Sequence, residues 1–196
     1  MSRCIIGIDE AGRGPLAGPV VVGAVALPKG SSLSFKGLPK LKDSKQLSKS
    51  QREVWFEYIK NNPDIFFSSA RIYQKKIDRI NIAQASNLAA SKALEYLMRE
   101  IGEPHEILID GSLYLGDPAH KDLNAKTIIR GDEKRTAIKL ASIVAKVTRD
   151  RYMDLLHERY PEYGFGSHKG YGTKFHLKMI KKHGICPIHR RTYTIK

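Results

Sequence analysis

The sequence predicts an α/β domain in which helices flank a mixed β-sheet. Two apolar runs rich in β-branched residues open the chain, and a short Gly/Pro-rich stretch separates them, as between neighbouring antiparallel strands. Later apolar runs alternate with segments of helical periodicity, which indicates strands connected through helices. The length of 196 residues suits one domain with its own hydrophobic core.

The first half of the chain predicts strands at residues 4–8 and 19–27. Residues 28–45 are rich in Lys, Ser, Gly and Pro, and we expect a loop there. Ser48 and Gln51 have the spacing of a capping box, so a helix is predicted to begin at Ser48. The apolar residues of this helix recur at helical spacing, at Val54, Trp55, Tyr58 and Ile59.

The middle of the chain predicts a strand at residues 65–73, followed by a helix. Asn81, with Gln84 three residues later, is the expected cap of this helix, which runs through Glu100. Its apolar residues form one stripe, at Ala85, Leu88, Ala89, Ala93, Leu94 and Leu97.

The last part of the chain predicts two further short strands, at residues 106–109 and 127–129. A long helix from about residue 133 to 157 follows them. The chain then continues as a Gly-rich loop at residues 164–172 and a helix at residues 173–183. The predicted architecture is therefore a mixed sheet flanked by helices, with a small C-terminal helical portion.

The charge of the chain favours a polyanionic partner. Lys and Arg number 34 against 20 Asp and Glu, which gives a formal net charge of +14. Such an excess favours nucleic acid, because each neutralised phosphate releases condensed counterions. Phosphorylated ligands, an anionic membrane surface, a generally basic proteome and a need for solubility are alternative explanations.

Several other classes of protein are disfavoured by composition. No apolar run approaches the roughly 20 residues that span a bilayer. The N-terminus has one basic residue and then an acidic pair, unlike a signal peptide. Cys4 and Cys186 lie near opposite ends, and no zinc-binding spacing occurs. We expect two reduced thiols in a cytoplasmic protein, with most of the histidines at the surface.

Acidic residues follow three of the predicted strands: Asp9 and Glu10, then Asp110, then Asp132. Ligands of open α/β sheets gather at the carboxyl ends of strands, so these acids could converge. Because adjacent strand residues face opposite sides, Asp9 and Glu10 can share a site only if the strand has ended before them. Clustered carboxylates repel one another, and Mg²⁺ or Mn²⁺ would offset the repulsion. Helix capping or pairing with basic residues would also explain the acids.

Two glycine-flanked segments, at residues 12–14 and 170–172, could let the backbone approach a sugar or phosphate. Both could equally be simple turns. Residues 43–45 (Asp-Ser-Lys) precede a helix and could hold a phosphate, although a solvated capping loop explains them as well. Tyr171 lies between two glycines, so contact with substrate is expected, with packing onto the sheet as the alternative.

Residues 7–15 (GIDEAGRGP), followed by residues 18–21 (GPVV), resemble the signature of the ribonuclease HII family. Further matching segments occur in order along nearly the whole chain: Asp43-Ser44-Lys45 with Leu47, Ile109-Asp110-Gly111, Gly131-Asp132, residues 141–147 with Arg149-Asp150, residues 169–173, and His189-Arg190.

The resemblance implies a ribonuclease H-like fold as a single catalytic domain over residues 1–196, with residues from about 160 to 196 as a substrate-binding helical appendage. It implies cleavage of the RNA strand of RNA–DNA hybrids, and cutting on the 5′ side of ribonucleotides embedded in duplex DNA. The products would carry 3′-hydroxyl and 5′-phosphate ends. The expected cofactors are two Mg²⁺ or Mn²⁺ ions.

The resemblance also implies roles for individual residues. The catalytic and metal-binding acids would be Asp9, Glu10, Asp110 and Asp132, with Asp9 between two ions. Glu133, Asp117 and Asp122 are alternatives for the fourth acid. The ribose 2′-hydroxyl would be sensed by Gly12, Arg13 and Gly14, and Tyr171 would stack at the RNA-to-DNA junction. Lys45 and Lys169 are expected to contact phosphates.

Three other functions are compatible with parts of the sequence. A small-molecule phosphate binder of Rossmann type would require a GxGxxG after the first strand, and Pro15 breaks that pattern. Ribonuclease HIII has similar acids but usually an extra N-terminal domain, for which the first strand near Cys4 is expected to leave no room. A nucleic-acid-binding protein without catalysis would have no use for four acids that repel phosphate. The partners expected are hybrid and ribonucleotide-containing duplexes, and a monomer suffices. The C-terminus IHRRTYTIK has no clear clamp-binding motif, so neither a replication clamp nor a membrane is expected.

Overall fold

The computed structural model describes residues 4–30, 33–102, 104, 106–111, 113–115 and 123–193. A five-stranded mixed sheet forms its centre, in the order β3-β2-β1-β4-β5. The strands are β1 (Cys4–Ala11), β2 (Val20–Pro28), β3 (Phe66–Ile72), β4 (Glu106–Asp110) and β5 (Ala125–Ile128). The first three pair antiparallel, whereas β4 and β5 run parallel to β1. This confirms the predicted mixed sheet.

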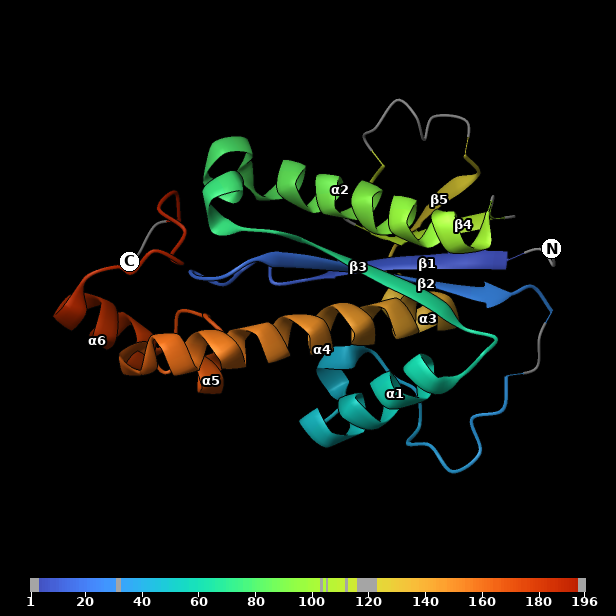
Figure 1. Cartoon of the computed structure of the whole chain (residues 1–196), viewed down its shortest axis with the longest axis horizontal. Coiled ribbons are helices and arrows are strands. Elements are labelled where there is room, and N and C mark those ends of the chain that lie inside the picture. The colour runs from blue at the N-terminus through green and yellow to red at the C-terminus, as the bar shows by residue number, and fades with distance from the viewer. Residues whose placement is uncertain are drawn as a thin grey trace.

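Helices cover both faces of the sheet (Figure 1). The long α2 (Gln74–Ile101) packs on one face, and α1 (Lys49–Asn61) and α4 (Thr136–Arg159) lie on the other. Trp55 and Ile59 of α1 are fully buried there. Most residues of the predicted apolar stripes are buried in this way, whereas Val54 of α1, which was predicted to belong to its stripe, is 45% exposed. Within the described ranges, none of the helices combines the length and hydropathy that a bilayer crossing needs.

Two glycines allow α4 to lie unusually close to the central strands. A β-carbon at Gly7 of β1 would lie 2.1 Å from the carbonyl carbon of Ala137. A β-carbon at Gly23 of β2 would lie 2.5 Å from the carbonyl oxygen of Ala141. Any side chain at these positions would push α4 off the sheet. This contact fixes α4 against the strand that carries Asp9.

The predicted caps are present. Ser48 forms the capping box with Gln51, and Thr173 caps α6 (Lys174–His183). Asn81 accepts a hydrogen bond from the Gln84 amide at 3.0 Å, as expected for a helix start. However, helical turns from Gln74 precede it, and Asn81 breaks them with a φ of 64°. With a ψ of 168° as well, Asn81 is not helical, so α2 consists of two helical segments that meet at a kink, and Asn81 begins the second of them.

Two further boundaries differ from prediction. The predicted long helix begins at Thr136 rather than residue 133, because a separate short helix, α3 (Gly131–Lys134), precedes it. The predicted Gly-rich loop contains one helical turn, α5 (Phe165–His168). Together with α6 and the end of α4, it encloses a small apolar cluster that includes Met153, Tyr163 and Phe165.

Candidate active site

The acids of the two central parallel strands meet at one edge of the sheet. Asp9 and Glu10 lie near the end of β1, and Asp110 is the last residue of β4. Each offers a carboxylate oxygen, and these oxygens lie within 4.8 Å of one another. Because β1 and β4 are parallel, the carboxyl ends of both strands face the same edge.

One condition set from the sequence is wrong. Asp9 and Glu10 share the site although β1 has not ended, since the strand continues to Ala11. The ladder between β1 and β4 stops at the pair Ile8–Ile109. Asp9 and Glu10 lie beyond this last pair, so neither residue is paired with a residue of β4. The longer Glu10 side chain can therefore reach the same side of the strand as Asp9. The Asp9 carboxylate also accepts a hydrogen bond from the backbone amide of the next residue, Glu10, at 2.7 Å.

The fourth predicted acid, Asp132, lies next to this group. Asp110 Oδ1 accepts hydrogen bonds from the amides of Gly131 at 2.7 Å and Asp132 at 3.4 Å. Asp132 is buried, and its carboxylate lies 3.5 Å from the Lys45 ammonium. Its oxygens are outside the 4.8 Å group formed by the other three acids. Glu133 is exposed, whereas Asp117 and Asp122 lie outside the described residues.

The electrostatics of the site disfavour the ionised form of Asp9. Burial raises the pKa of Asp9 well above its ordinary value, and the neighbouring carboxylates of Glu10 and Asp110 raise it further. A hydrogen bond from Ser142 opposes this pKa shift. The causes are the burial of the Asp9 carboxyl and the negative charge concentrated around it.

The acidic group is suited to a hard cation. All the donors are carboxylate oxygens, which Mg²⁺ and Mn²⁺ prefer. A divalent ion would also offset the mutual repulsion that raises the Asp9 pKa. Asp9, Glu10 and Asp110 therefore fit a divalent metal ion by donor type and by proximity.

A pocket of about 540 Å³ lies beside the acids. Among its lining residues are several predicted from the sequence: Glu10, Gly12, Arg13, Gly14, Lys45 and Tyr171. Tyr171 is 46% exposed, and a β-carbon at Gly14 would lie 3.7 Å from its ring. Segments from the two ends of the chain thus lie next to each other in the lining of one pocket.

Three further basic residues line this pocket, and none of them was assigned a role from the sequence: Arg52, Lys146 and Arg149. Arg52 lies 3.7 Å from the Asp150 carboxylate, and Lys146 donates to the same carboxylate at 2.8 Å. Burial lowers the pKa of Lys146. Lys146 and Arg149 belong to the motif at residues 141–150. Arg52 reaches the pocket only because α1 packs against α4.

Lys45 and Lys169 differ in accessibility. The Lys45 side chain is 76% exposed. Burial alone would lower its pKa, but the carboxylates of Asp43, Asp132 and Asp9 raise the pKa of Lys45 above its ordinary value. Asp43 also caps the turn at Ser44–Gln46 by accepting from the Lys45 amide. Lys45 therefore carries its charge at the pocket rim.

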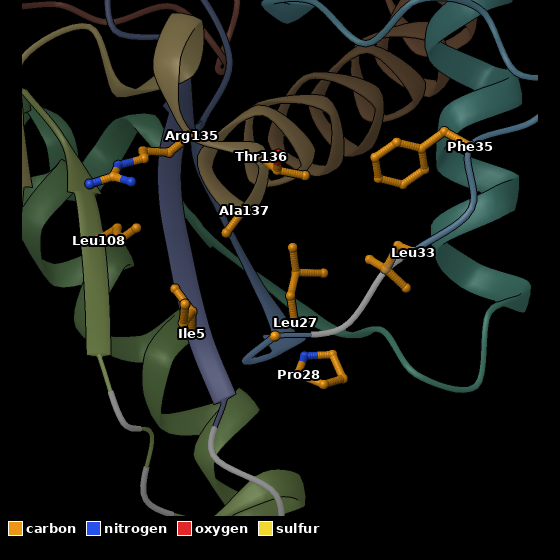
Figure 2. Close-up of a pocket in the computed structure, with 10 residues that line it drawn as sticks. Ile5, Leu27, Pro28, Leu33, Phe35, Leu108, Arg135, Thr136 and Ala137 are labelled. Carbon is orange, nitrogen blue, oxygen red and sulfur yellow. The ribbon is translucent and has the colours of Figure 1, made fainter.

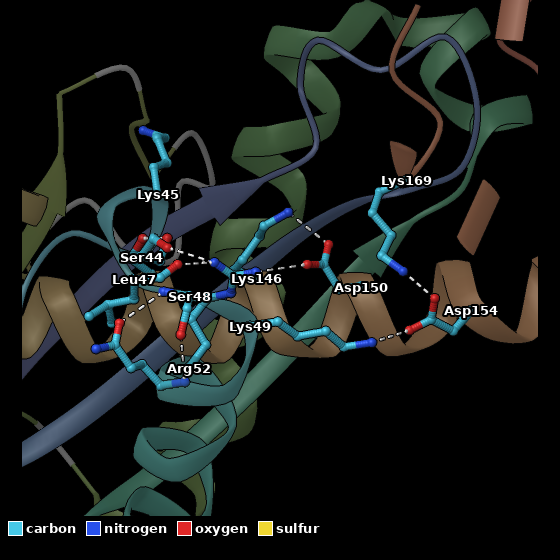
Figure 3. Close-up of polar contacts among 12 residues, drawn as sticks. Ser44, Lys45, Leu47, Ser48, Lys49, Arg52, Lys146, Asp150, Asp154 and Lys169 are labelled. Carbon is cyan, nitrogen blue, oxygen red and sulfur yellow. Dashed lines mark hydrogen bonds and ion pairs between the residues drawn. The ribbon is translucent and has the colours of Figure 1, made fainter. Parts of the chain in front are cut away.

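Lys169, in contrast, is buried, with only 9% of its surface exposed. Its ammonium pairs with Asp154 and donates to the Gly166 carbonyl at 2.6 Å (Figure 3). Lys49 of α1 contacts the same Asp154 carboxylate at 3.4 Å. The Lys169 side chain therefore extends toward α4 and not into the pocket beside the acids. Its predicted contact with phosphate has no support from this geometry.

A second cavity lies at the other end of the central strands (Figure 2). It is lined largely by apolar residues near the start of β1 and the end of β2, such as Ile5 and Leu27, with Arg135 at its side. The volume is about 350 Å³. Because no carboxylate is among its described lining residues, the acidic pocket is the better candidate for catalysis.

Comparison with solved structures identifies the class of fold. The ribonuclease H2 of Pyrococcus horikoshii OT3 is 30% identical and superposes with a TM-score of 0.73, covering 97% of this chain and 93% of that one. The RNase HII in a PCNA complex from Archaeoglobus fulgidus is 25% identical with a TM-score of 0.72, covering 98% and 96%. The chain therefore has a ribonuclease H-like fold.

The sequence comparisons are more specific. A family model described as Ribonuclease HII matches residues 6–196. A Ribonuclease HII from Endomicrobium trichonymphae is 47% identical over 97% of this chain and 85% of its own length. The chain belongs to the ribonuclease HII family. It is thus a ribonuclease H, an enzyme type that depends on divalent metal ions and acts on RNA–DNA hybrids.

Proposed function

We propose that this enzyme cleaves the RNA strand of hybrids and also cuts on the 5′ side of ribonucleotides embedded in duplex DNA, leaving 3′-hydroxyl and 5′-phosphate ends. The observation that carries the proposal is the position of the acids. Asp9, Glu10 and Asp110 converge beside a pocket that is lined by Gly12–Gly14 and Tyr171. A scissile phosphate and an adjacent sugar can be held there together.

The acids are proposed to hold two divalent ions, Mg²⁺ or Mn²⁺. When bound, such ions activate water and stabilise the developing charge on the leaving oxygen. Asp9 is the most buried acid of the group, and we propose that it contacts both ions. Asp132 is the fourth ligand in the proposal, because its backbone is hydrogen-bonded to Asp110 and it is buried where Glu133 is exposed.

The loop at residues 12–14 is proposed to read the ribose 2′-hydroxyl. Gly12 has a φ of 96°, and a β-carbon there would lie 2.0 Å from the Arg149 side chain. The loop therefore depends on glycine for its shape. Backbone amides can distinguish a 2′-hydroxyl at one nucleotide without reading its base. Tyr171, which is exposed beside this loop, would stack on the neighbouring nucleotide.

The remaining duplex needs contacts with phosphates, which carry no sequence information. Lys45, Arg52 and Lys146 supply positive charge along the pocket. Residues from about 160 to 196 are proposed as the substrate-binding portion of a single catalytic domain, because they carry Tyr171. The net charge of +14 agrees with such a partner.

Recruitment by a clamp is a separate question. The Archaeoglobus relative was solved in a complex with PCNA. The prediction that the C-terminus of this chain lacks a clamp motif is untested, and residues 194–196 lie outside the described part. A pull-down with the clamp of the same organism would decide it.

One gel tests the proposed activity. A DNA duplex with a single ribonucleotide in one labelled strand is incubated with Mg²⁺, with Mn²⁺ and with EDTA. We expect one cut on the 5′ side of the ribonucleotide with either metal ion, and none with EDTA. An all-DNA duplex of the same sequence is the control. Binding without cleavage in either metal would support a non-catalytic role and contradict the proposal.

A further inference from the structure

The C-terminal segment at residues 188–193 lies against both loops that the proposed function assigns to substrate. The amide of Arg190 donates to the Leu16 carbonyl at 2.8 Å, and the Ile188 carbonyl accepts from Gly18 at 2.9 Å. Leu16 in turn donates to the carbonyl of Gly170 at 2.8 Å. The loop after β1, the Tyr171 loop and the C-terminal segment therefore form one hydrogen-bonded unit.

Arg190 binds the carbonyl side of the glycine loop. Its guanidinium donates to the carbonyls of Gly12 at 2.6 Å, Arg13 at 2.8 Å and Gly18 at 3.0 Å. In a trans peptide the carbonyl and the following amide point in opposite directions. The amides of Arg13 and Gly14 therefore point away from the buried guanidinium.

Tyr193 and Arg149 extend this support. The Tyr193 hydroxyl accepts from Arg190 at 3.0 Å and donates to the Arg13 carbonyl at 2.6 Å. Arg149 donates to the carbonyls of Ala17 at 3.2 Å and Pro19 at 2.9 Å. Both arginines are at most 2% exposed. Their planar guanidinium groups hold several peptide carbonyls in a fixed fork geometry, which the compact ammonium of a lysine does not provide.

His189, the residue before Arg190, reaches the Tyr171 loop through a second histidine. His189 Nε2 lies 3.0 Å from His176 Nε2, and His176 Nδ1 lies 2.9 Å from the Tyr171 carbonyl. His176 is fully buried and His189 is 3% exposed. Burial lowers the pKa of His176 to about 4 and lowers that of His189 as well, so both rings are neutral near pH 7.

The hydrogen-bond chain defines a single arrangement of protons. A carbonyl can only accept, so His176 carries its proton on Nδ1 and its Nε2 accepts. His189 must then carry its proton on Nε2. Its Nδ1 is left to accept from the Cys186 amide, which lies 2.9 Å away. His168, stacked on His176 at 4.5 Å, donates from Nε2 to the Tyr163 carbonyl and accepts from the Gly170 amide.

We propose that His189 and Arg190 are positioning residues that hold the two substrate-reading loops in register, Arg190 for residues 12–14 and His189, through His176, for Tyr171. The inference rests on the proposed function, since it assigns these loops to the ribonucleotide. It adds that adjacent C-terminal residues control both. Arg190 would affect reading of every 2′-hydroxyl, and His189 would affect the junction contact alone.

The first test needs no substrate. Long-range ¹H–¹⁵N NMR of the metal-free wild-type enzyme reports the tautomer of each histidine ring. We expect His176 as the Nδ1–H form and His189 and His168 as Nε2–H forms at pH 7. His176 as the Nε2–H form, or a charged His176 at this pH, would overturn the histidine connection whatever the enzyme cleaves.

The second test compares two substrates, a duplex with one embedded ribonucleotide and a uniform hybrid. Loss of one positioning hydrogen bond is expected to cost about threefold to tenfold. Arg190→Lys keeps the charge but not the planar fork, so kcat/KM should fall about tenfold on both substrates. His189→Leu should lower kcat/KM about threefold to tenfold on the embedded ribonucleotide relative to the hybrid.

Two matched variants complete the experiment. His189→Gln keeps a donor at the position of Nε2, so it should restore most of the lost selectivity. Arg191→Met removes a neighbouring cation whose backbone amide bonds to Asp78, and it should leave the substrate ratio unchanged. A His189→Leu ratio equal to that of the wild type, or an Arg190→Lys activity within twofold of it, overturns the proposal. A wild-type enzyme that ignores the embedded ribonucleotide instead refutes the proposed function.

Discussion

Two groups of like charge flank the loop at residues 12–19, and they differ in how the fold treats them. Before the loop, Asp9, Glu10 and Asp110 place three carboxylates within 4.8 Å of one another. Beneath it, Arg149 and Arg190 are also like charges in a buried place. Each arginine donates to main-chain carbonyls, so its charge is hydrogen-bonded within the fold.

The comparison separates charge that shapes the protein from charge that serves its chemistry. Burial lowers the pKa of Arg149 to about 10, with Arg190 as the next cause, yet at that value the group stays protonated near pH 7. Burial and neighbouring acids raise the pKa of Asp9, which makes its ionised form costly to the folded state. The arginines stabilise a loop, whereas the acids are kept at a cost to stability that a metal ion would offset.

The largest expected effect comes from the acidic group. Asp9→Asn should lower cleavage by about a thousandfold or more, because metal catalysis supplies several kcal/mol to the transition state. Binding of the duplex should be unchanged or tighter, since a charge that repels phosphate has been removed. Single-turnover cleavage and fluorescence anisotropy measure the two. Cleavage near the wild-type rate in saturating Mg²⁺ would show that Asp9 is not a metal ligand.

The next effect concerns the loop opposite the acids. Tyr171→Ala should lower cleavage of a single-ribonucleotide duplex about tenfold to a hundredfold, because stacking on a nucleotide contributes about 1–3 kcal/mol. A uniform hybrid, which offers no RNA-to-DNA step, should be affected less. The measurement is the ratio of kcat/KM on the two substrates, and circular dichroism checks the fold. Tyr171→Phe is the matched control, since it keeps the ring. An unchanged ratio would assign Tyr171 to packing.

Stability should change in opposite directions at the two groups of charge. In metal-free enzyme, Asp9→Asn should raise the melting temperature at pH 7. The folded pKa of Asp9 is raised, so its stabilising contribution exists at low pH and is lost as the pH rises through that pKa. The advantage of the variant should therefore vanish below about the ordinary value of 3.8.

Arg149→Met should instead lower the melting temperature at pH 7. It leaves the carbonyls of Ala17 and Pro19 without their guanidinium donor, at about 1–3 kcal/mol for each buried group. In a chain of this size each kcal/mol corresponds to about 2–4 °C. Thermal melts in EDTA measure both variants. Equal shifts of the same sign would contradict the distinction between the acids and the arginines.

The smallest effect distinguishes two lysines that the sequence treats alike. Affinity for duplexes should fall with salt, with a slope in log K of about −0.9 for each neutralised phosphate. Lys45→Gln should reduce this slope by about one phosphate, because the Lys45 side chain is exposed at the pocket rim. Lys169→Gln should leave the slope unchanged and lower the melting temperature, since Lys169 is buried against Asp154. Equal slope changes would restore Lys169 as a phosphate contact.

Local signals in the sequence were sufficient for most of the fold. Ser48 with Gln51, and Thr173, each cap a helix at the predicted position, and Asn81 with Gln84 begins the second segment of the kinked α2. Such caps depend on residues within one turn, so they can be recognised without the rest of the chain. The start of α4 was misplaced because residues 131–134 form a helical turn of their own, and a left-handed Arg130 begins it.

The candidate site was partly recognisable for a similar reason. Asp9, Glu10 and Asp110 follow apolar strands, and the order of strands in an α/β sheet brings such positions together. The prediction that Asp9 and Glu10 share a site only beyond the end of the strand was wrong because it rested on β1 alone. The end of the β1–β4 ladder decides where the Glu10 side chain can reach. Lys169 carries the charge of a phosphate ligand, but its burial against Asp154 depends on how α5 packs on α4.

The sequence by itself determined the alternation of strands and helices, their apolar faces, the acids at the strand ends and the family to which they belong. These follow from periodicity, capping and motif, which are properties of short segments. Tertiary structure alone decided which distant groups meet. Arg190 bonds to the carbonyl of Gly12 across 178 residues, and His189 reaches Tyr171 through His176. No local pattern encodes such contacts. They arise only when the whole sheet has formed and the C-terminal segment packs against the loop that follows β1.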